Sequence, residues 1–363
     1  MLAGVRIIEV EGLGPGPFAA MTLADLGADV IVVHRKGGNV TVGSAGRSVL
    51  DRGKRSIELD LKDADDLNVL RKLVSHADGL IEGFRPGVME KLGIGPEACH
   101  AINRKLVFGR MTGWGQQGPL SHAAGHDLNY IAMSGALWYA SAPGDAPMTP
   151  PTLVGDIGGG ALYLVVGMLA GIMNARTSGQ GTVVDAAIYD GSAHMMNLLM
   201  TLRQFGNLPD ERGRGILDGP HWCGTYATQD GGWMSVQCLE PQFYARFLAL
   251  LDLSDDPDFA GQNDEKTWAK ATERLREIFA TRTRDEWSEL FLGTDACVAP
   301  VLSPNEAQAH EMNVSRGVWG EADGVLQTAP APRFAGQAEW TPSVGPKRGA
   351  HTDEILDELA KLK

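Results

Sequence analysis

The chain has 363 residues, of which 44% are hydrophobic, so it can bury a large core, and its length favours two or three domains. Its 32 basic and 45 acidic residues give a net charge of −13, which argues against a nucleic-acid-binding surface but leaves room for an anionic ligand held by a local basic cluster. The four cysteines show neither Cys-x-x-Cys spacing nor a paired His/Cys motif, so no zinc site or disulfide framework is indicated.

The first ten residues form a short apolar run without a preceding basic segment, which is typical of a strand and not of a signal peptide. No window approaches the length of a membrane span. We therefore expect a cytoplasmic protein with no membrane or nucleic-acid partner.

Strand and helix signals alternate over the first 205 residues. Short β-branched or apolar runs predict strands at 5–10, 29–33, 56–60, 80–81, 106–111 and 183–185. Apolar residues at helical spacing predict helices at 17–27, 64–77, 157–176 and 191–204. Such alternation predicts an α/β domain with a parallel sheet and crossover helices.

The pattern changes after a polar, glycine-rich linker at 206–222. Runs at 224–228 and 233–238 flank Gln229-Asp230-Gly231-Gly232, which predicts a β-hairpin. Pro241 then opens a helix at the favoured first position, and further helices are predicted near 268–280 and 284–292. These elements define a small domain over 223–310. A proline-rich extended stretch at 330–346 and a short helix at 351–362, capped by Thr352, complete the chain.

Two local features suggest ligand contacts. The stretch Glu11-Gly12-Leu13-Gly14-Pro15-Gly16-Pro17 fails the G-x-G-x-x-G spacing and places proline inside the loop, so it favours a tight turn over an NAD site. Basic residues fall after predicted strands or between elements, where ligands bind in open α/β sheets and where they could hold phosphates. Ordinary surface charge is the alternative for each of them: His34, Arg35, Lys36, Arg52, Lys54, Arg55 and Arg85.

Asp156 stands just before a predicted helix and is followed by Gly158-Gly159-Gly160. An aspartate there is an ordinary N-cap. A cap does not explain three glycines, each of which costs about 1 kcal/mol in a helix relative to alanine. The glycines suggest a close approach to the backbone, and the unpaired N–H groups of a helix N-terminus suit an oxyanion. His126 lies in a glycine-containing loop and Glu240 precedes Pro241. Structural roles are the alternative for both.

Eight ordered segments together resemble the family III CoA-transferase superfamily, most closely its α-methylacyl-CoA racemase branch, over nearly the whole chain. They are 25–30 (DLGADV), 54–60 (KRSIELD), 82–87 (EGFRPG), 111–116 (MTGWGQ), 125–127 (GHD), 155–156 (GD), 295–301 (DACVAPV) and 349–352 (GAHT). Transferases of the superfamily use an aspartate at the position of Asp156 as an acyl-accepting nucleophile. The branch is therefore indicated by His126 and Glu240, which match residues of the racemases. One departure is Thr152, where the racemases carry asparagine.

The resemblance implies an interlocked homodimer. Each chain would have a Rossmann-like, CoA-binding large domain over 1–205 and a smaller α/β domain, and residues 311–363 would return to the large domain. Glu240 would reach His126 across the dimer interface. The catalytic residues would be His126, Asp156 and Glu240. The expected CoA or substrate contacts are Arg35, Lys54, Arg55, Arg85, Gly125, Asp127, Tyr130, Thr152, Gly158 and Gly159.

The implied reaction interconverts (2R)- and (2S)-2-methylacyl-CoA thioesters. His126 would remove the α-proton to leave an enolate, and protonated Asp156 would deliver a proton to the opposite face. Backbone N–H groups near Asp156 and the glycine run could hold the enolate oxygen. No metal or other cofactor is expected, since coenzyme A is part of the substrate. The alternative is a CoA transferase that is acylated on Asp156.

Overall fold

The chain forms two compact units in a computed structural model that describes residues 1–38 and 47–362. The first unit comprises residues 1–137, 149–195 and 311–363, and the second comprises 138–148 and 196–310. The large unit thus ends before the expected boundary at 205, and the helix that precedes this boundary groups with the second unit. The C-terminal residues 311–363 group with the first unit, although residues 196–310 of the second unit separate them from the rest of its sequence.

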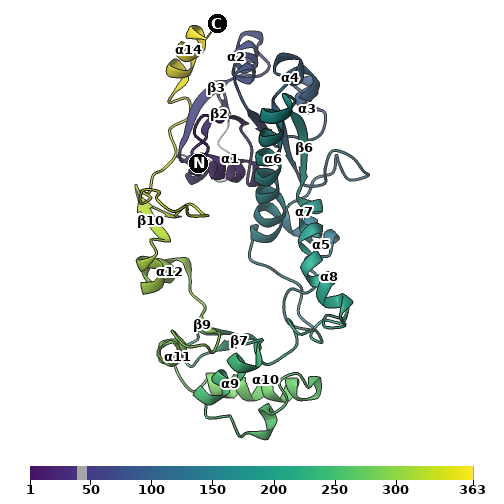
Figure 1. The fold of residues 1–363 in the computed structure, drawn as a ribbon, viewed down its shortest axis with the longest axis vertical. Coiled ribbons are helices and arrows are strands. Elements are labelled where there is room, and N and C mark those ends of the chain that lie inside the picture. The colour runs from purple at the N-terminus through teal and green to yellow at the C-terminus, as the bar shows by residue number, and fades with distance from the viewer. Residues whose placement is uncertain (39–46, 363) are drawn as a thin grey trace. The chain divides into compact units, whose positions relative to one another are not determined.

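The first unit is built on a six-stranded, all-parallel sheet with the strand order β3-β2-β1-β4-β5-β6 (Figure 1). Its strands are β1 (Arg6–Val10), β2 (Asp29–Arg35), β3 (Lys54–Leu59), β4 (Gly79–Glu82), β5 (Val107–Thr112) and β6 (Thr182–Ala187). The predicted parallel α/β sheet is confirmed. This order reverses direction between β1 and β4, which is the point where open α/β sheets bind ligands at the carboxyl ends of their strands.

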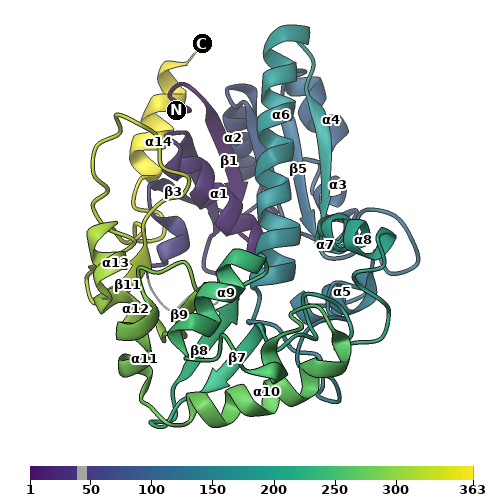
Figure 2. The same cartoon turned by 60° about the horizontal axis from the view of Figure 1, so that its bottom comes forward.

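Helices cover both faces of the sheet, as the near-continuous apolar strands require. Ile7 and Ile8 are both fully buried, one in each of the two apolar clusters that flank the sheet. One face carries α1 (Pro15–Asp25) and α6 (Leu162–Ser178). The other carries α2 (Ala64–Ser75), α3 (Val88–Lys91), α4 (Pro96–Ile102) and the terminal α14 (Thr352–Lys361) (Figure 2).

The long helix predicted at 157–176 has two parts. A π-helical segment, η2 (Leu153–Ala161), precedes α6 and packs against α7 (Ile188–Met195). The glycines of η2 make this packing possible. A Cβ on Gly159 would lie 2.4 Å from Ser192 Oγ, and one on Gly160 would lie 2.8 Å from Ile188 Cγ1. The close approach that the glycine run suggested is therefore made by a neighbouring helix.

The helical stretch Leu153–Ser178 is long and apolar enough, by length and composition, to cross a membrane. The sequence-based statement that no window reaches that length was therefore wrong. In the structure one side of the stretch belongs to the core of the α/β unit, because Leu164, Met168 and Ile172 form a buried face of α6. Its opposite face is exposed.

The second unit has a three-stranded antiparallel sheet in the order β7-β8-β9. Its strands are β7 (Cys223–Ala227), β8 (Trp233–Gln237) and β9 (Val298–Pro300), and its helices are α8 (Asn197–Gln204), α9 (Pro241–Leu250), α10 (Glu265–Phe279), α11 (Arg284–Phe291) and α12 (Pro304–Ala309), with a short 3₁₀ turn, η3 (Pro257–Phe259). The predicted hairpin is present. The helix predicted at 191–204 is broken into α7 and α8, and β9 was not predicted from its three residues.

The remaining elements belong to the first unit. They are a 3₁₀ turn η1 (Val49–Asp51), α5 (Asp127–Ser134), α13 (Glu311–Ser315) and a hairpin of β10 (Trp319–Ala322) and β11 (Val325–Thr328). Residues 330–346 have no regular structure, in accord with their proline content. The N-cap of α14 is His351 and not Thr352, whose hydroxyl instead donates to the Gly349 carbonyl oxygen.

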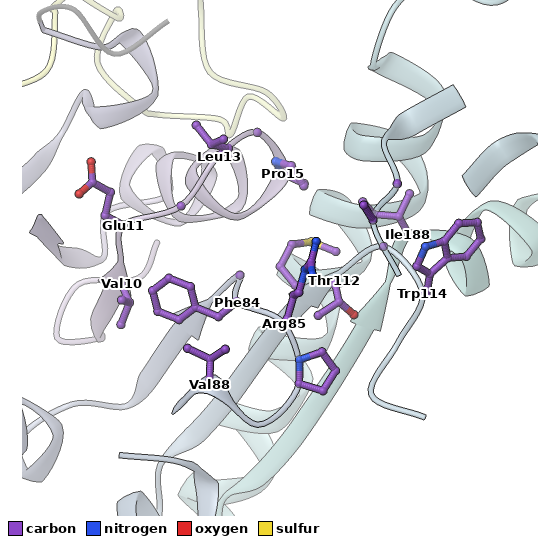
Figure 3. Close-up of a pocket in the computed structure, with 18 of the residues that line it drawn as sticks. Val10, Glu11, Leu13, Pro15, Phe84, Arg85, Val88, Thr112, Trp114 and Ile188 are labelled. Carbon is purple, nitrogen blue, oxygen red and sulfur yellow. The ribbon is translucent and has the colours of Figure 1, made fainter. Parts of the chain in front are cut away.

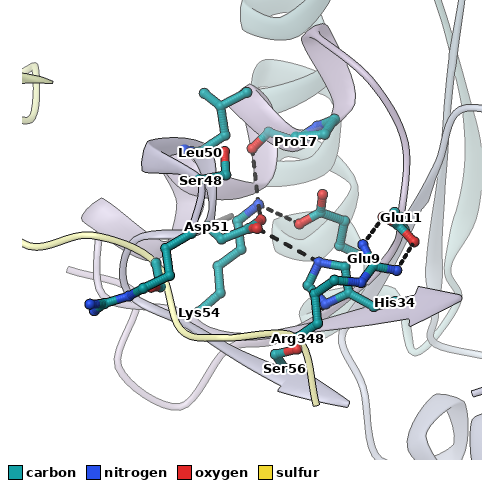
Figure 4. Close-up of polar contacts among 12 residues, drawn as sticks. Glu9, Glu11, Pro17, His34, Ser48, Leu50, Asp51, Lys54, Ser56 and Arg348 are labelled. Carbon is teal, nitrogen blue, oxygen red and sulfur yellow. Dashed lines mark hydrogen bonds and ion pairs between the residues drawn. The ribbon is translucent and has the colours of Figure 1, made fainter. Parts of the chain in front are cut away.

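Ion pairs fasten the C-terminal segment to the sheet. Arg55 on β3 pairs with Asp29 on β2 and with Glu358 on α14, and Arg6 pairs with the same two carboxylates. Arg348 pairs with Glu11 at the end of β1 (Figure 4). These links explain why residues 311–363 group with the first unit.

A buried ion pair lies beneath that segment. The Lys54 Nζ atom lies 2.5 Å from Glu9 Oε2 and 3.1 Å from the Pro17 carbonyl oxygen, and both side chains are almost completely buried (Figure 4). Asp51 and His34 extend the cluster, with 3.6 Å between His34 Nε2 and Asp51 Oδ2. Burial raises the pKa of Glu9, and the Lys54 ammonium opposes that rise.

Lys54→Met is expected to lower the free energy of unfolding by about 3–5 kcal/mol, because it leaves the Glu9 carboxylate buried without its cation. Urea unfolding followed by circular dichroism measures the change. The matched control is Glu9→Gln/Lys54→Met, which removes both charges and is expected to recover much of the loss. A single variant as stable as the parent would show that Lys54 and Glu9 do not form this pair.

Candidate active site

A cavity of about 900 Å³ opens at the carboxyl ends of the sheet strands, within the first unit. Its walls include the segments that follow β1 to β5, which is the position expected for a ligand in this strand order. Figure 3 shows Phe84 and Val88 on one side of the cavity and Trp114 with Ile188 on the other, with Arg85 between them. The cavity is large enough for a drug-sized or nucleotide-sized ligand.

Six of the sequence-predicted site residues line this cavity: Arg35, Arg85, Gly125, His126, Tyr130 and Asp156. Arg35 and Arg85 are exposed side chains at its wall, so their guanidinium groups are available to an anionic ligand. The turn from Gly12 to Pro15 also forms part of the wall. The stretch that failed as an NAD motif is therefore a ligand-cavity wall built by a tight turn, with Gly14 at a φ of +63°.

His126 is the exposed N-cap residue of α5. Its backbone N–H donates to Asn129 Oδ1 at 3.0 Å, and the Tyr130 hydroxyl donates to the Gly125 carbonyl oxygen. The Tyr130 ring also packs edge-on against Trp114, with 4.8 Å between ring centroids. These contacts hold the peptide group between Gly125 and His126, and the His126 side chain lies at the cavity wall.

Asp156 lies inside η2, half-buried, with its carboxylate facing the β1–α1 turn. A Cβ on Gly14 would lie 3.7 Å from Asp156 Oδ2. Thr152 donates its hydroxyl to the same oxygen at 2.6 Å. Burial raises the pKa of Asp156, and the Thr152 hydrogen bond opposes this rise. The carboxyl group is thus biased toward the protonated form that an acid catalyst needs.

The N-cap interpretation of Asp156 is wrong, because the start of η2 is held by a different aspartate. Asp127 is 8% exposed, and its Oδ1 accepts hydrogen bonds from the backbone N–H groups of Gly155 and Asp156, both at 2.8 Å. These two N–H groups are therefore occupied and are not available to an enolate oxygen. Gly158 and Gly159 pack against α7 and do not line the cavity.

Other predicted contacts also lie outside the cavity lining. Lys54 is buried against Glu9, and Arg55 is held by Asp29 and Glu358, so both have structural partners in place of a ligand. Thr152 acts on Asp156 and does not line the cavity. Glu240 lies in the second unit as the exposed N-cap residue of α9, and its side chain makes no capping hydrogen bond among the described residues.

Several lining residues were missed from the sequence. Phe84, Thr112 and Trp114 come from two segments, 82–87 and 111–116, that carried the family resemblance but had no chemistry assigned to most of their residues. Each segment begins where a predicted buried strand ends. The rule that ligands bind at the carboxyl ends of parallel strands could have found them.

The sequence of the chain also matches a known protein family. Residues 2–352 match the family model described as CoA-transferase family III. The chain belongs to this family, which confirms the resemblance seen in its sequence segments.

Within this family, the chain is similar to two alpha-methylacyl-CoA racemases. An alpha-methylacyl-CoA racemase of Mus musculus is 41% identical over 365 residues, which cover 99% of this chain and 93% of the relative. The Homo sapiens alpha-methylacyl-CoA racemase is 38% identical with the same coverage. Among solved structures, a CAIB/BAIF family protein from Brucella suis superposes with a TM-score of 0.83 at 27% identity and covers 98% of both chains.

Thr152→Val is expected to raise the pKa of Asp156. Activity that depends on the protonated Asp156 carboxyl group should then persist to higher pH. The variant keeps the shape of threonine but loses the hydroxyl that stabilises the charged carboxylate, so the pKa of Asp156 rises further. The pH profile of kcat measures the shift. Thr152→Asn is the control, because asparagine tolerates the φ of +63° that is rare for a β-branched residue and can still donate a hydrogen bond. An unchanged profile in Thr152→Val would contradict this role.

Proposed function

We propose that this chain is an α-methylacyl-CoA racemase that interconverts (2R)- and (2S)-2-methylacyl-CoA thioesters. The observation that carries the proposal is the presence of His126 and Asp156, an imidazole and a carboxyl group, in the wall of one cavity. Such a pair can serve as base and acid on opposite faces of one carbon. The similarity to two named racemases over nearly the whole chain supports the same reaction.

In the proposed reaction, His126 removes the α-proton of the thioester to leave a planar enolate, and Asp156 delivers a proton to the opposite face. In the reverse direction the two residues exchange roles. The raised pKa of Asp156 supports its acid role, since a protonated carboxyl group is required for that step. Arg35 and Arg85 are proposed to bind the phosphates of coenzyme A. The proton transfers need no metal or other cofactor.

We further propose that two copies form a homodimer in which Glu240 of one chain orients the His126 imidazole of the other. The exposed face of α6 supports association, since its large apolar side chains Leu162, Val166 and Met173 are 46%, 64% and 71% exposed. Exposed large apolar side chains that recur along one helix are a feature of association surfaces. A cytoplasmic location without membrane or nucleic-acid partners completes the proposal.

Val166→Asp is expected to convert the dimer to a monomer, because it places a charge in the centre of the apolar stripe of α6. Sedimentation velocity measures the change in mass, and racemase activity is expected to fall with it, since Glu240 would no longer reach its partner. Asn174→Asp is the control, because it adds the same charge at an exposed polar position of the same helix. A dimer of Val166→Asp with full activity would contradict this interface.

The proposed reaction is tested by incubating an enantiopure 2-methylacyl-CoA with the protein and resolving the products by chiral chromatography. Loss of enantiomeric purity is expected without any added acid acceptor. The rival is a CoA transferase acylated on Asp156. It predicts instead an aspartyl adduct that borohydride or hydroxylamine traps for mass spectrometry, together with CoA transfer to a free acid. That result, without racemisation, would reject the proposal.

A further inference from the structure

The Asp127 side chain connects the backbone segments that carry the two candidate acid/base residues, His126 and Asp156. Asp127 directly follows His126, and its Oδ1 accepts the backbone N–H groups of Gly155 and of Asp156 itself, both at 2.8 Å. His126 and Asp156 are thirty positions apart in sequence. Because Asp127 is 8% exposed, little water reaches these hydrogen bonds.

Both ends of this link are closely packed. On the α5 side, the N–H of His126 is held by Asn129 and the carbonyl oxygen of Gly125 by Tyr130. On the η2 side, a Cβ at position 155 would lie 2.5 Å from Asp127 Oδ1 and 2.9 Å from Ile131 Cγ2, so any larger residue there would have to displace a neighbour. The start of η2 therefore rests directly on Asp127.

We propose that Asp127 is a positioning residue that sets the separation between the His126 imidazole and the Asp156 carboxyl group; this inference rests on the racemase function proposed above. It touches neither reacting atom. A two-base proton transfer needs both groups in line with one carbon, and a displacement of about 1 Å far from the chemistry can lower the rate about 10²-fold. A carboxylate is also well suited to this place, since it meets the positive end of a helix.

The test is Asp127→Ala assayed with each enantiomer of a 2-methylacyl-CoA in D₂O. His126 keeps its own support from Asn129, whereas Asp156 loses its tether. We expect kcat for inversion to fall about 10²-fold with KM little changed. The enantiomer whose α-proton faces His126 should still exchange that proton for deuterium with retention, and the opposite enantiomer should lose exchange. Asp127→Asn, which keeps an acceptor oxygen, should restore inversion to within several-fold of the parent.

Asp63→Ala is the matched control for loss of a helix cap. Asp63 also accepts two consecutive backbone N–H groups with one oxygen, from Asp65 and Asp66 at 2.9 and 3.0 Å, but it does not line the cavity. It should leave the exchange of both enantiomers unchanged. Equal slowing of deuterium exchange for the two enantiomers in Asp127→Ala, or unchanged inversion, would overturn the positioning role. Absence of exchange in the parent protein would instead reject the proposed function.

Gly155→Ala provides a second route if Asp127→Ala does not fold. The added methyl group displaces the Asp127 carboxylate while leaving its chemistry intact. It should reproduce the same difference in deuterium exchange between enantiomers, and equal exchange rates for the two would overturn the proposal. Gly224→Ala is its control, since no atom of the described residues, apart from the two chain neighbours, lies within 4 Å of the added methyl group.

Discussion

His126→Ala is expected to lower the rate of racemisation by about 10²–10⁴-fold, the usual contribution of one positioned acid/base group. The side chain is exposed in the cavity wall and its backbone is fixed by Asn129, so its removal should leave the fold intact. Steady-state kinetics with both enantiomers measures the loss, and KM for the acyl-CoA should change little. Exchange at the carbon face served by His126 should disappear in the same variant.

His122→Ala is the matched control, because His122 is exposed four residues earlier and does not line the cavity. It should retain the parent rate. A transferase that uses Asp156 as its nucleophile would keep much of its activity in His126→Ala. Racemisation by His126→Ala at the parent rate would therefore contradict the role of His126 as an acid/base residue, which is the role that distinguishes the racemase from the transferase.

Asp156→Asn is expected to reduce inversion by a similar factor of about 10²–10⁴, because asparagine has nearly the same shape but cannot exchange a proton. Its amide oxygen can still accept the Thr152 hydroxyl, so the side chain should keep its place. Deuterium exchange by His126 on its own face should persist with retention of configuration. Equal loss of exchange for both enantiomers would show that the two residues do not serve opposite faces.

The same variant should change the pH dependence of stability. Because burial raises the pKa of Asp156, the folded protein binds its proton more tightly than the unfolded chain does. Stability from this group is present below the unfolded pKa and is lost as pH rises through the folded pKa. Asp156→Asn removes that loss, so it should be more stable than the parent at pH values above the folded pKa. Urea midpoints across pH measure the difference, and parallel curves would contradict the assigned shift.

The sequence predicted the large sheet well because its strands are continuous apolar runs between helices of clear periodicity. Val5 to Val10 and the apolar residues of α6 carry that signal locally. Strand β9 was missed because three residues are too few to show a periodic pattern. The break between α7 and α8 was missed because a short interruption does not disturb the apolar pattern around it. The π-helix was also missed, because its form depends on how closely α7 approaches the glycines.

The site was only partly predictable for a related reason. His126 and Asp156 were found through their family segments, and both line the cavity. Asp127 was expected to contact the substrate, yet it holds η2, because the contact between residues 127 and 155 exists only in the folded chain. Lys54 was expected near phosphates because of its charge, its place between predicted elements and its family segment. Its burial against Glu9 depends on the pairing of strands and could not be read from a basic cluster.

The central claim is that one cavity exchanges the α-proton of an acyl-CoA between its two faces. It is tested most directly by incubating (2R)-2-methylacyl-CoA with the protein in D₂O and following the α-carbon by NMR and chiral chromatography. We predict the appearance of the (2S) product with deuterium at the α-position, without any free acid as acceptor. No deuterium incorporation, together with rapid transfer of CoA to an added acid, would contradict the account.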